Sequence, residues 1–272
     1  MEIENKKCAY CNSSKLKLRT NIINKERHFL VPGLLDLERK WYNCNHCGIC
    51  FSIPRLNKKD IDYMYENYRS EAFRGESPDQ YFDRITNYSP EESENHQKVQ
   101  WIISNIDQAW NPTKILDIGC GGGVLLDTLR RTYKKAQLYG IEPTESYAEL
   151  ASRRTGAKVN NGYFHKDSFP QNIFNLVPCC QVLEHIDDLN LFVNDLRKIT
   201  DKSSFIYIEV PDIKDFDTLP LDHFIFSEPS HLWYFSSAFL NPYFISNGFE
   251  ILLSDVITTI RSRNDLRYLL RK

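Results

Sequence analysis

The sequence predicts an α/β protein in which a doubly wound, mainly parallel sheet follows a small cysteine-rich module. Two patterns lead to this prediction. From about residue 112 onward, short apolar runs alternate with segments of helical periodicity, which is typical of parallel strands joined by crossover helices. The first 55 residues contain two Cys-x-x-Cys pairs. A chain of 272 residues is long enough for one α/β domain and one smaller module.

The composition is that of an ordinary globular protein, with 42% hydrophobic and 26% charged residues. The formal net charge of −2 lacks the basic surplus of nucleic-acid-binding proteins and favours a small-molecule or glycan partner. No apolar run is long enough to span a membrane, and the charged stretch 1–7 has no signal-peptide core, so we expect a cytoplasmic protein. In that reducing compartment, the eight cysteines are not expected to form disulfides.

The two cysteine pairs predict a structural zinc site in a zinc-ribbon-like module over residues 1–55. Two residues between thiolates let one tight turn direct both sulfurs at a single ion, and two such turns complete a closed tetrahedral site. The four predicted ligands are Cys8, Cys11, Cys44 and Cys47. Cys50 extends the second pair, so it could replace either ligand there, whereas His46 is expected to point outward. Residues 41–42 are expected in a strand that leads into the second turn.

Residues 56–100 are polar and rich in tyrosine, and we expect them to form a helical connector or lid. Asp60 is placed to cap a helix over 61–68, and Pro90 predicts the start of a second helix that runs from 91 to 106. Most tyrosines here are expected to pack between module and domain. The candidates for a pocket are Tyr65 and Tyr68.

Residues 101–272 carry the alternating pattern of the predicted sheet. Strands are expected at 113–118, 137–141, 157–160, 175–180, 204–210, 249–253 and 266–270. Helices are expected at 124–129, 145–154, 188–200 and 236–247. Ligands of such sheets bind outside the carboxyl ends of the strands, so the functional residues are expected there.

A glycine-rich loop, Gly119-Cys-Gly-Gly-Gly123, follows the first strand of this sheet. Glycines at this place allow the backbone to approach a ligand closely. Glu142 ends the second strand, 23 residues beyond Gly119, where a carboxylate can accept hydrogen bonds from both hydroxyls of an adenosine ribose. The loop and the acid together predict an adenosine-containing cofactor.

The segment from Asp117 to Gly123 resembles motif I of the class I S-adenosylmethionine-dependent methyltransferases. A dinucleotide-binding loop would need a third glycine where Val124 stands. The resemblance implies a Rossmann-like, seven-stranded methyltransferase sheet with S-adenosylmethionine as cofactor. It also implies the cofactor-binding residues, which are Asp117, Gly119, Gly121, Glu142, Phe164 and Gln181. Of these, Phe164 is expected beside the adenine base.

Two further segments extend the resemblance. Residues 181–186 (QVLEHI) and 230–236 (SHLWYFS) are similar to segments of small-molecule methyltransferases. The cysteine-rich module before such a domain resembles bacterial methyltransferases that act on nucleotide-linked or surface-polysaccharide sugars. The sugar C-methyltransferases of that group carry a further C-terminal domain and adjacent Glu and His, whereas here Glu228 and His231 are three apart. We therefore expect O-methylation of a sugar hydroxyl, with C-methylation as an alternative.

Transfer to a hydroxyl requires a base near the acceptor, and histidine titrates close to neutral pH. His185 and His231 are the candidate bases, and the sequence does not rank them. Glu184 and Glu228 could orient a histidine or bind substrate hydroxyls. Glu184 and His185 could also be partial ligands of a metal, although the sequence offers no clear third ligand.

Three other hypotheses are weaker. A zinc-module RNA methyltransferase is disfavoured by the near-neutral charge and by the sequence at 180–184, CQVLE, where an N-P-P-Y or D-P-P-Y segment would be expected. The intact loop and Glu142 argue against a non-enzymatic adaptor. Val124 argues against an NAD-dependent sugar oxidoreductase. The sequence does not indicate the oligomeric state.

Overall fold

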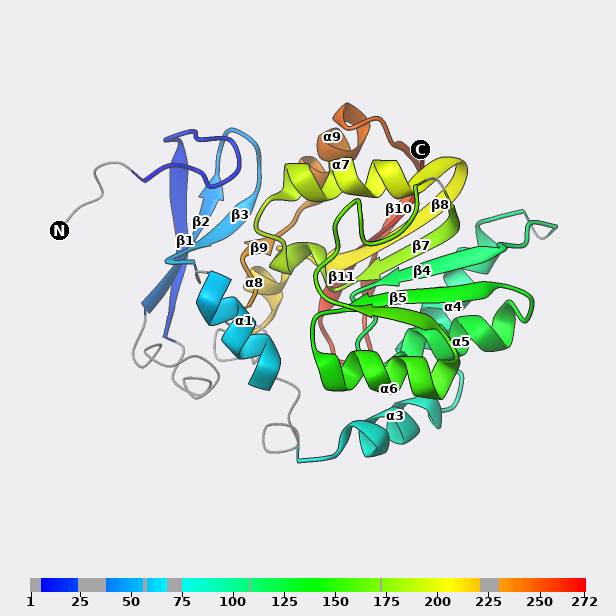
Figure 1. The fold of residues 1–272 in the computed structure, drawn as a ribbon. Helices are drawn as coiled ribbons and strands as arrows, with labels where there is room; N and C mark the ends of the chain where they lie inside the picture. The colour runs from blue at the N-terminus through cyan, green and yellow to red at the C-terminus, as the bar shows by residue number, and fades with distance from the viewer. Residues whose placement is uncertain are drawn as a thin grey trace.

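The structure is a computed structural model that describes residues 6–23, 38–55, 58–67, 75–107, 109–171, 173–220 and 230–272. Figure 1 shows a large sheet covered by helices, with a smaller sheet beside it that contains the N-terminal strands. Tyr68 and Glu228, both named above as candidate site residues, lie outside the described residues.

The large sheet has seven strands in the order β10-β11-β8-β7-β4-β5-β6, which confirms the predicted fold class. Its strands are β4 (Lys114–Ile118), β5 (Gln137–Glu142), β6 (Lys158–Asn161), β7 (Phe174–Cys180), β8 (Thr200–Pro211), β10 (Glu250–Thr258) and β11 (Asn264–Arg271). Only β11 runs antiparallel to its neighbours β8 and β10. The chain order reverses between β4 and β7, the place where ligands bind in such sheets.

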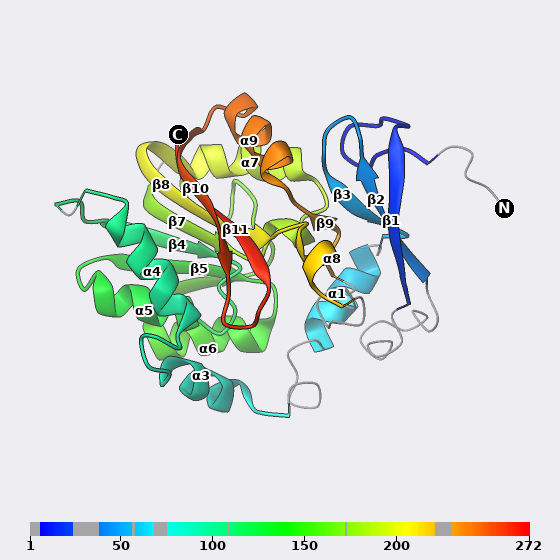
Figure 2. The ribbon, with the colours of Figure 1, turned by 180° about the vertical axis from the view of Figure 1, so that it is seen from behind.

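Helices cover both faces of this sheet (Figures 1 and 2). One face carries α4 (Glu94–Ser104), α5 (Val124–Thr132) and α6 (Glu145–Thr155), and the other carries α7 (Leu189–Ile199) and α9 (Ser237–Ser246). Successive strand residues point to opposite faces, so Ile115 packs with the first group of helices and Leu116 with the second. Both residues are fully buried, as expected for parallel strands with two covered faces.

The small sheet joins segments that are far apart in the sequence. Its strands are β1 (Leu16–Ile23), β2 (Glu38–Cys44), β3 (Cys50–Ile53) and β9 (Trp233–Tyr234), in that order. The expected strand at 41–42 is part of β2. The sequence did not predict β9, which pairs antiparallel with β3 through Cys50 and Phe51. The N-terminal module is therefore completed by two residues from the C-terminal part of the chain.

The connector differs from the prediction. Helix α1 (Lys58–Asn67) contains Asp60 in its first turn, so Asp60 does not cap it. Helix α4 begins at Glu94 rather than at 91, because the Ser93 side chain accepts a hydrogen bond from the backbone N–H of His96 at 3.2 Å and caps the helix there. An additional helix, α3 (Pro78–Thr86), was not predicted. The short helices η2 (Leu183–His185) and α8 (Asp215–Thr218) were also not predicted.

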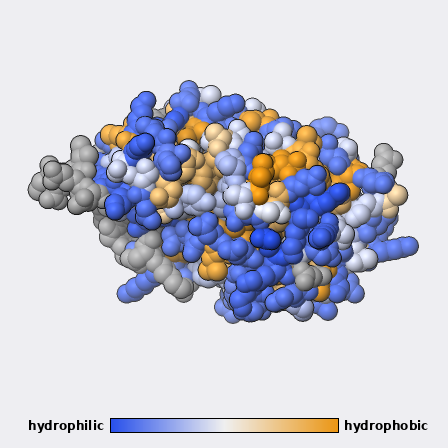
Figure 3. Space-filling model, turned by 90° about the horizontal axis from the view of Figure 1, so that it is seen from above, coloured by the Kyte–Doolittle hydropathy of each residue, from blue (hydrophilic) through white to orange (hydrophobic). Residues whose placement is uncertain are grey.

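The surface over α7 and α9 mixes hydrophobic and hydrophilic residues (Figure 3). Leu191 of α7 and Ile245 of α9 are exposed apolar side chains. Among the described residues, no helix has the length and apolar character needed to cross a membrane.

Candidate active site

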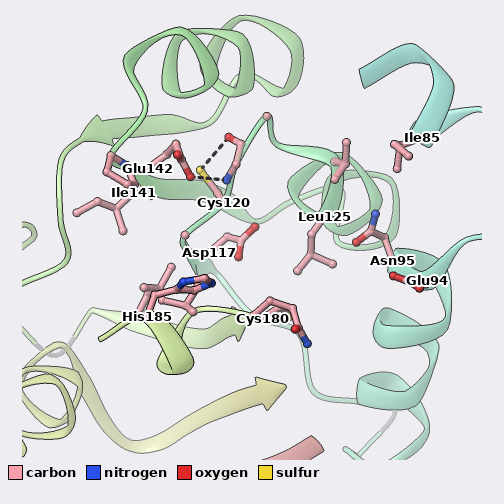
Figure 4. Close-up of a pocket in the computed structure, with 18 of the residues that line it drawn as sticks. Ile85, Glu94, Asn95, Asp117, Cys120, Leu125, Ile141, Glu142, Cys180 and His185 are labelled. Carbon is pink, nitrogen blue, oxygen red and sulfur yellow. Dashed lines mark hydrogen bonds between the residues drawn. The ribbon is translucent and has the colours of Figure 1, made fainter. Parts of the chain in front are cut away.

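A cavity of about 800 Å³ opens at the carboxyl ends of β4, β5 and β7 (Figure 4). A volume of this size suits a cofactor together with part of a second ligand. All six predicted cofactor-binding residues line it, namely Asp117, Gly119, Gly121, Glu142, Phe164 and Gln181. His185, His231 and Tyr65 also line it. The fold thus brings the predicted cofactor residues and both candidate bases to one cavity.

The glycine loop needs glycine for two physical reasons. Gly119 has a positive φ of 71°, and a Cβ there would lie 2.4 Å from Cγ2 of Val182. Gly123 has a φ of 86°, and a Cβ there would lie 2.9 Å from the Cα of Ala151 in α6. Both the backbone conformation and the lack of space exclude larger residues. The loop can therefore turn tightly from β4 into α5 and present its backbone to the cavity.

Glu142 lies directly against this loop. One carboxylate oxygen, Oε2, accepts a hydrogen bond from the Gly121 N–H at 2.9 Å, and Oε1 accepts one from the Thr144 N–H at 3.0 Å. Figure 4 shows Glu142 and Cys120 together at one side of the cavity. A carboxylate can accept about four hydrogen bonds, so acceptor capacity remains for ribose hydroxyls. The loop and the acid face one shared hollow, which fits the adenosine part of S-adenosylmethionine.

Asp117 forms part of the cavity wall between the glycine loop and β7 (Figure 4). It is only 2% exposed. Burial and the nearby Glu142 charge raise the pKa of Asp117 to about 8, although Lys98 acts in the opposite direction. At neutral pH this carboxyl is mainly protonated, so it can donate a hydrogen bond as well as accept one.

A buried ion pair, whose lysine lines the cavity, was not predicted. The Lys98 ammonium of α4 lies 2.9 Å from Oε1 of Glu209 on β8, and the Tyr207 hydroxyl donates to the other carboxylate oxygen at 2.5 Å. Burial disfavours the charged lysine, but the Glu209 carboxylate outweighs this effect and raises the pKa of Lys98. A signal for this residue was present, because Lys98 lies four residues before the buried Ile102 and so falls on the apolar face of the helix.

The two candidate bases lie next to each other. The ring centroids of His185 and His231 are 4.8 Å apart, and the planes meet at 67°. Nδ1 of His185 is 3.1 Å from the carbonyl oxygen of Ser230. A carbonyl only accepts, so Nδ1 carries the proton and Nε2 is the basic nitrogen of the neutral ring.

Glu184 lies behind this pair and is fully buried. Its Oε1 is 3.8 Å from Nε2 of His185. Burial raises the pKa of Glu184 to about 8. Ligand atoms of Glu184, His185 and His231 all lie within 4.8 Å of one another. The structure thus adds His231 to Glu184 and His185, a third side chain that the sequence did not reveal, and a carboxylate with two imidazoles is a donor set for divalent cations.

Aromatic side chains border the same end of the cavity. Tyr65 of α1 lies 6.5 Å from His185 and 6.1 Å from Tyr163, measured between ring centroids. Tyr163 is 44% exposed. Tyr88, which also lines the cavity, accepts a hydrogen bond from Arg84 of α3 and is 39% exposed.

The four paired cysteines come together in the N-terminal module. The sulfur atoms of Cys8 and Cys47 are 3.8 Å apart, and those of Cys11 and Cys44 are 3.6 Å apart. Tetrahedral zinc with bonds of about 2.3 Å requires sulfur separations of about 3.8 Å, so the cluster fits this ion. Cys50 is not part of the cluster, since it is buried with Trp41 and Tyr234 in the small sheet, and the idea that it replaces a ligand is wrong. His46 is exposed, as predicted.

Comparison with known proteins identifies related sequences and folds. A family model described as "Methyltransferase domain" matches residues 69–254. A ubiquinone biosynthesis O-methyltransferase of Pelagibacter ubique is 26% identical over 170 residues, which are 56% of this chain and 64% of that protein. A protein of the same name from Stutzerimonas stutzeri is 30% identical over 114 residues, or 40% of this chain and 47% of that protein. The match thus spans about half to two thirds of the length of these relatives.

A solved structure shares the fold. It is titled as a complex between the Haloferax volcanii Trm112 methyltransferase activator and the putative methyltransferase. The likeness has a TM-score of 0.60 and 13% identity, and it covers 76% of this chain and 97% of that chain. At this identity the comparison supports the architecture of the sheet and its helices.

Proposed function

This chain belongs to the methyltransferase-domain family. From that premise we propose that it is an S-adenosylmethionine-dependent methyltransferase that methylates a hydroxyl oxygen of a small molecule, most specifically a sugar hydroxyl. The observation that carries this proposal is the position of His185 and His231 in the same cavity as the glycine loop and Glu142. A base beside the cofactor is what transfer to a weakly acidic hydroxyl requires.

In this proposal, the cofactor-binding residues have separate roles. The backbone of Gly119 and Gly121 borders the cofactor, Glu142 accepts the ribose hydroxyls, and Phe164 lies near the adenine. Asp117 and Gln181 border the remaining part of the cofactor. When bound, S-adenosylmethionine supplies an activated methyl group, so the protein contributes mainly orientation and the exclusion of water.

His185 is proposed as the base that accepts the hydroxyl proton. Its Nδ1 is directed at the Ser230 carbonyl, which leaves Nε2 to take the proton as the oxygen attacks. Buried Glu184, whose Oε1 is 3.8 Å from Nε2 of His185, is proposed to orient this ring. His231 packs against His185 and is proposed to orient the acceptor hydroxyl.

The relatives suggest a second acceptor class. Both are named as O-methyltransferases of ubiquinone biosynthesis, which favours oxygen as the methylated atom and adds a phenolic hydroxyl as a candidate. A phenol ionises far more readily than a sugar hydroxyl, so it depends less on a base. The tyrosine rings that line the cavity can stack on either a sugar or an aromatic ring.

The cysteine cluster is proposed to hold one structural zinc ion, since four thiolates leave no open coordination position. We assign residues 1–55 to this module, 56–100 to a connector that borders the cavity, and 101–272 to the methyltransferase domain. The connector contributes Tyr65 and Tyr88 to the cavity, which fits a role beside the acceptor.

The proposal is tested by incubating the protein with labelled S-adenosylmethionine and separate panels of nucleotide sugars, free sugars, catechols, RNA and protein. Label is expected in a sugar panel. His185→Asn should lower transfer at least about 100-fold and leave S-adenosylhomocysteine affinity unchanged, whereas His46→Asn, an exposed histidine, should change neither. If label enters only the catechols, the proposed methyl acceptor is a phenolic hydroxyl and not a sugar hydroxyl. Label only in RNA or protein, or full activity of His185→Asn, would contradict the proposal.

The same assay distinguishes the metal alternative for the three-residue cluster. If Glu184, His185 and His231 hold a divalent cation, added Mg²⁺ or Mn²⁺ should stimulate transfer by protein dialysed free of these ions. Equal rates with and without these ions support the role of His185 as base.

A further inference from the structure

The segment that carries His231 is held between two parts of the molecule. On the module side, Trp233 and Tyr234 pair with β3, and the Ser52 N–H donates to the carbonyl of Leu232 at 3.4 Å. On the domain side, the Leu232 N–H donates to the carbonyl of Glu184 at 2.8 Å. His231 is thus one residue away from a position bonded to both the module and the turn that carries His185.

Arg39 of the module reaches this segment directly. It lies on β2 and is only 2% exposed. Its Nη2 donates hydrogen bonds to the carbonyl oxygen of His231 and to Oγ of Ser52, the latter at 2.8 Å. The guanidinium lies over the Trp41 ring, 5.1 Å from its centroid. A planar cation fixed between a ring and two oxygens can hold the His231 backbone in one place.

A second arginine of the module contacts the other side of the same region. The Arg55 guanidinium lies 4.1 Å from the centroid of the Trp233 ring, and it forms an ion pair with Asp187 at 3.0 Å. The indole N–H of Trp233 donates to the carbonyl of Ile186 at 2.6 Å. The module is therefore anchored to both sequence segments that supply the paired histidines.

The length of β9 makes these contacts necessary. Two residues form the strand, and only two residue pairs join it to β3. So short a pairing specifies its register weakly, and a slip by one residue would turn side chains to the opposite face. His231 would then leave the cavity. Contacts from outside the strand are needed to fix it.

We propose that the N-terminal module is a positioning part of the active site, in which Arg39 is the positioning residue that holds His231 against His185. This proposal rests on the proposed function only in treating the two histidines as the site of chemistry. The arrangement of the His185 and His231 rings, which this proposal concerns, can be measured without a methyl acceptor.

The test compares Arg39→Gln, Arg39→Lys and Arg19→Gln in the full chain. Arg19 is the matched control, because it also links module and domain, through Asp217 at 2.7 Å, but lies away from the histidines in sequence and contacts. Histidine ring signals are recorded in ¹H–¹³C spectra at one pH and assigned with His185→Asn and His231→Asn. S-adenosylhomocysteine affinity is measured by calorimetry on each variant.

Arg39→Gln is expected to shift the ring signals of both histidines and to leave S-adenosylhomocysteine affinity within about twofold, a difference under 0.5 kcal/mol. Arg39→Lys should give smaller shifts, since it keeps the positive charge that Arg39→Gln removes. Arg19→Gln should reproduce the wild-type spectrum. With an acceptor in hand, Arg39→Gln should lower kcat about tenfold and leave KM for S-adenosylmethionine unchanged.

Unshifted histidine signals in folded Arg39→Gln would overturn the proposal. If that variant does not fold, Arg39→Lys decides, and wild-type signals there would overturn it as well. If Arg19→Gln shifts the histidine signals as much as Arg39→Gln does, the shifts reflect a general loosening of the module. That result would also overturn the proposal. Failure of the proposed function is a separate result, seen as wild-type protein that transfers no methyl group to any hydroxyl.

Discussion

Glu142 illustrates how one residue can shape the cofactor site and also bind within it. Its carboxylate accepts hydrogen bonds from the N–H groups of Gly121 and Thr144, so it connects the loop after β4 to the turn after β5. The remaining lone pairs face the cavity. Because the acid organises the loop that borders the same ligand, its loss should affect binding more than the loss of a single contact.

We predict that Glu142→Ala weakens S-adenosylhomocysteine binding by at least about tenfold, because hydrogen bonds to a charged group contribute about 1.5–3 kcal/mol. Calorimetry measures the affinity. Glu149→Gln, which changes an exposed acid on α6, is the control and should bind as the wild type does. Unchanged affinity in a folded Glu142→Ala protein would remove this residue from the site.

Asp117 gives a prediction about pH. Its pKa in the folded protein is about 8, above the ordinary value of 3.8, because of burial and the Glu142 charge. Between pH 3.8 and pH 8, Asp117 is protonated in the native state and ionised in the unfolded chain. Its favourable contribution to the free energy of unfolding is therefore complete below pH 3.8 and is lost as the pH rises to about 8. The contribution of Asp117 to the stability of the ligand-free protein should therefore fall from pH 5 to pH 8.

Asp117→Asn cannot titrate at this position and should lose less stability over the same interval. We expect the two proteins to differ in their pH dependence by at least about 1 kcal/mol, since one pKa unit corresponds to about 1.4 kcal/mol. Urea unfolding at both pH values measures this difference. Parallel pH dependence in the two proteins would show that Asp117 is ionised in the folded state.

The cofactor residues whose position at the cavity was predicted from the sequence share a local origin. Gly119 follows β4 and Glu142 ends β5, and both strands have a clear apolar pattern, so the place of these residues at the edge of the sheet could be derived from a few neighbouring residues. The approach of His231 to His185 could not be derived in this way. The two are separated by 46 positions in the sequence and meet through tertiary contacts alone.

At the scale of elements, the helices and strands that were not predicted depend on signals other than hydrophobic periodicity. Helix α3 begins with a capping box, in which the Ser77 hydroxyl accepts from the Gln80 N–H and the Gln80 side chain accepts from the Ser77 N–H. The pattern S-P-D-Q was visible in the sequence. Strand β9 had no such signal, because its two residues become a strand only through pairing with β3.

The buried pair between α4 and β8 predicts a large effect on stability. Lys98→Met leaves Glu209 buried without its cation, and removing one partner of a buried ion pair costs about 3–5 kcal/mol. Chemical denaturation measures the free energy of unfolding. Lys202→Met, at an exposed position, should change it little.

A double variant tests whether the loss of stability comes from the unpaired charge of Glu209. Lys98→Met with Glu209→Gln removes both charges and should recover part of the lost stability. If Lys98→Met alone unfolds as the wild type does, the lysine and glutamate do not form an ion pair that matters for folding.

At the scale of the whole molecule, the module and the domain are not independent units. The small sheet takes β9 from the C-terminal part of the chain, while Arg39 and Arg55 of the module contact the segments around the histidines. Tyr10, between Cys8 and Cys11, packs edge-on against Phe239 of α9 at 5.0 Å. A change at the cysteine cluster can therefore reach the domain through direct contacts.

This arrangement leads to a prediction for the metal. The purified protein should contain about one zinc ion per chain, and Cys44→Ser should lose it, because the ion needs all four thiolates for tight binding. Cys50→Ser is the matched control, since Cys50 is buried in β3 outside the cluster and should leave the zinc content unchanged. Metal analysis measures both.

The loss of zinc should also affect the structure outside the module. Cys44 ends β2 and Cys50 opens β3, so a turn released by loss of the metal loosens the strand that pairs with β9. We expect Cys44→Ser to lower the melting temperature of the whole chain and to shift the ring signals of His185 and His231, as Arg39→Gln does. A metal-free Cys44→Ser protein with wild-type histidine signals would mean that the cluster stabilises only its own turns, and that β9 is held in register by the domain alone.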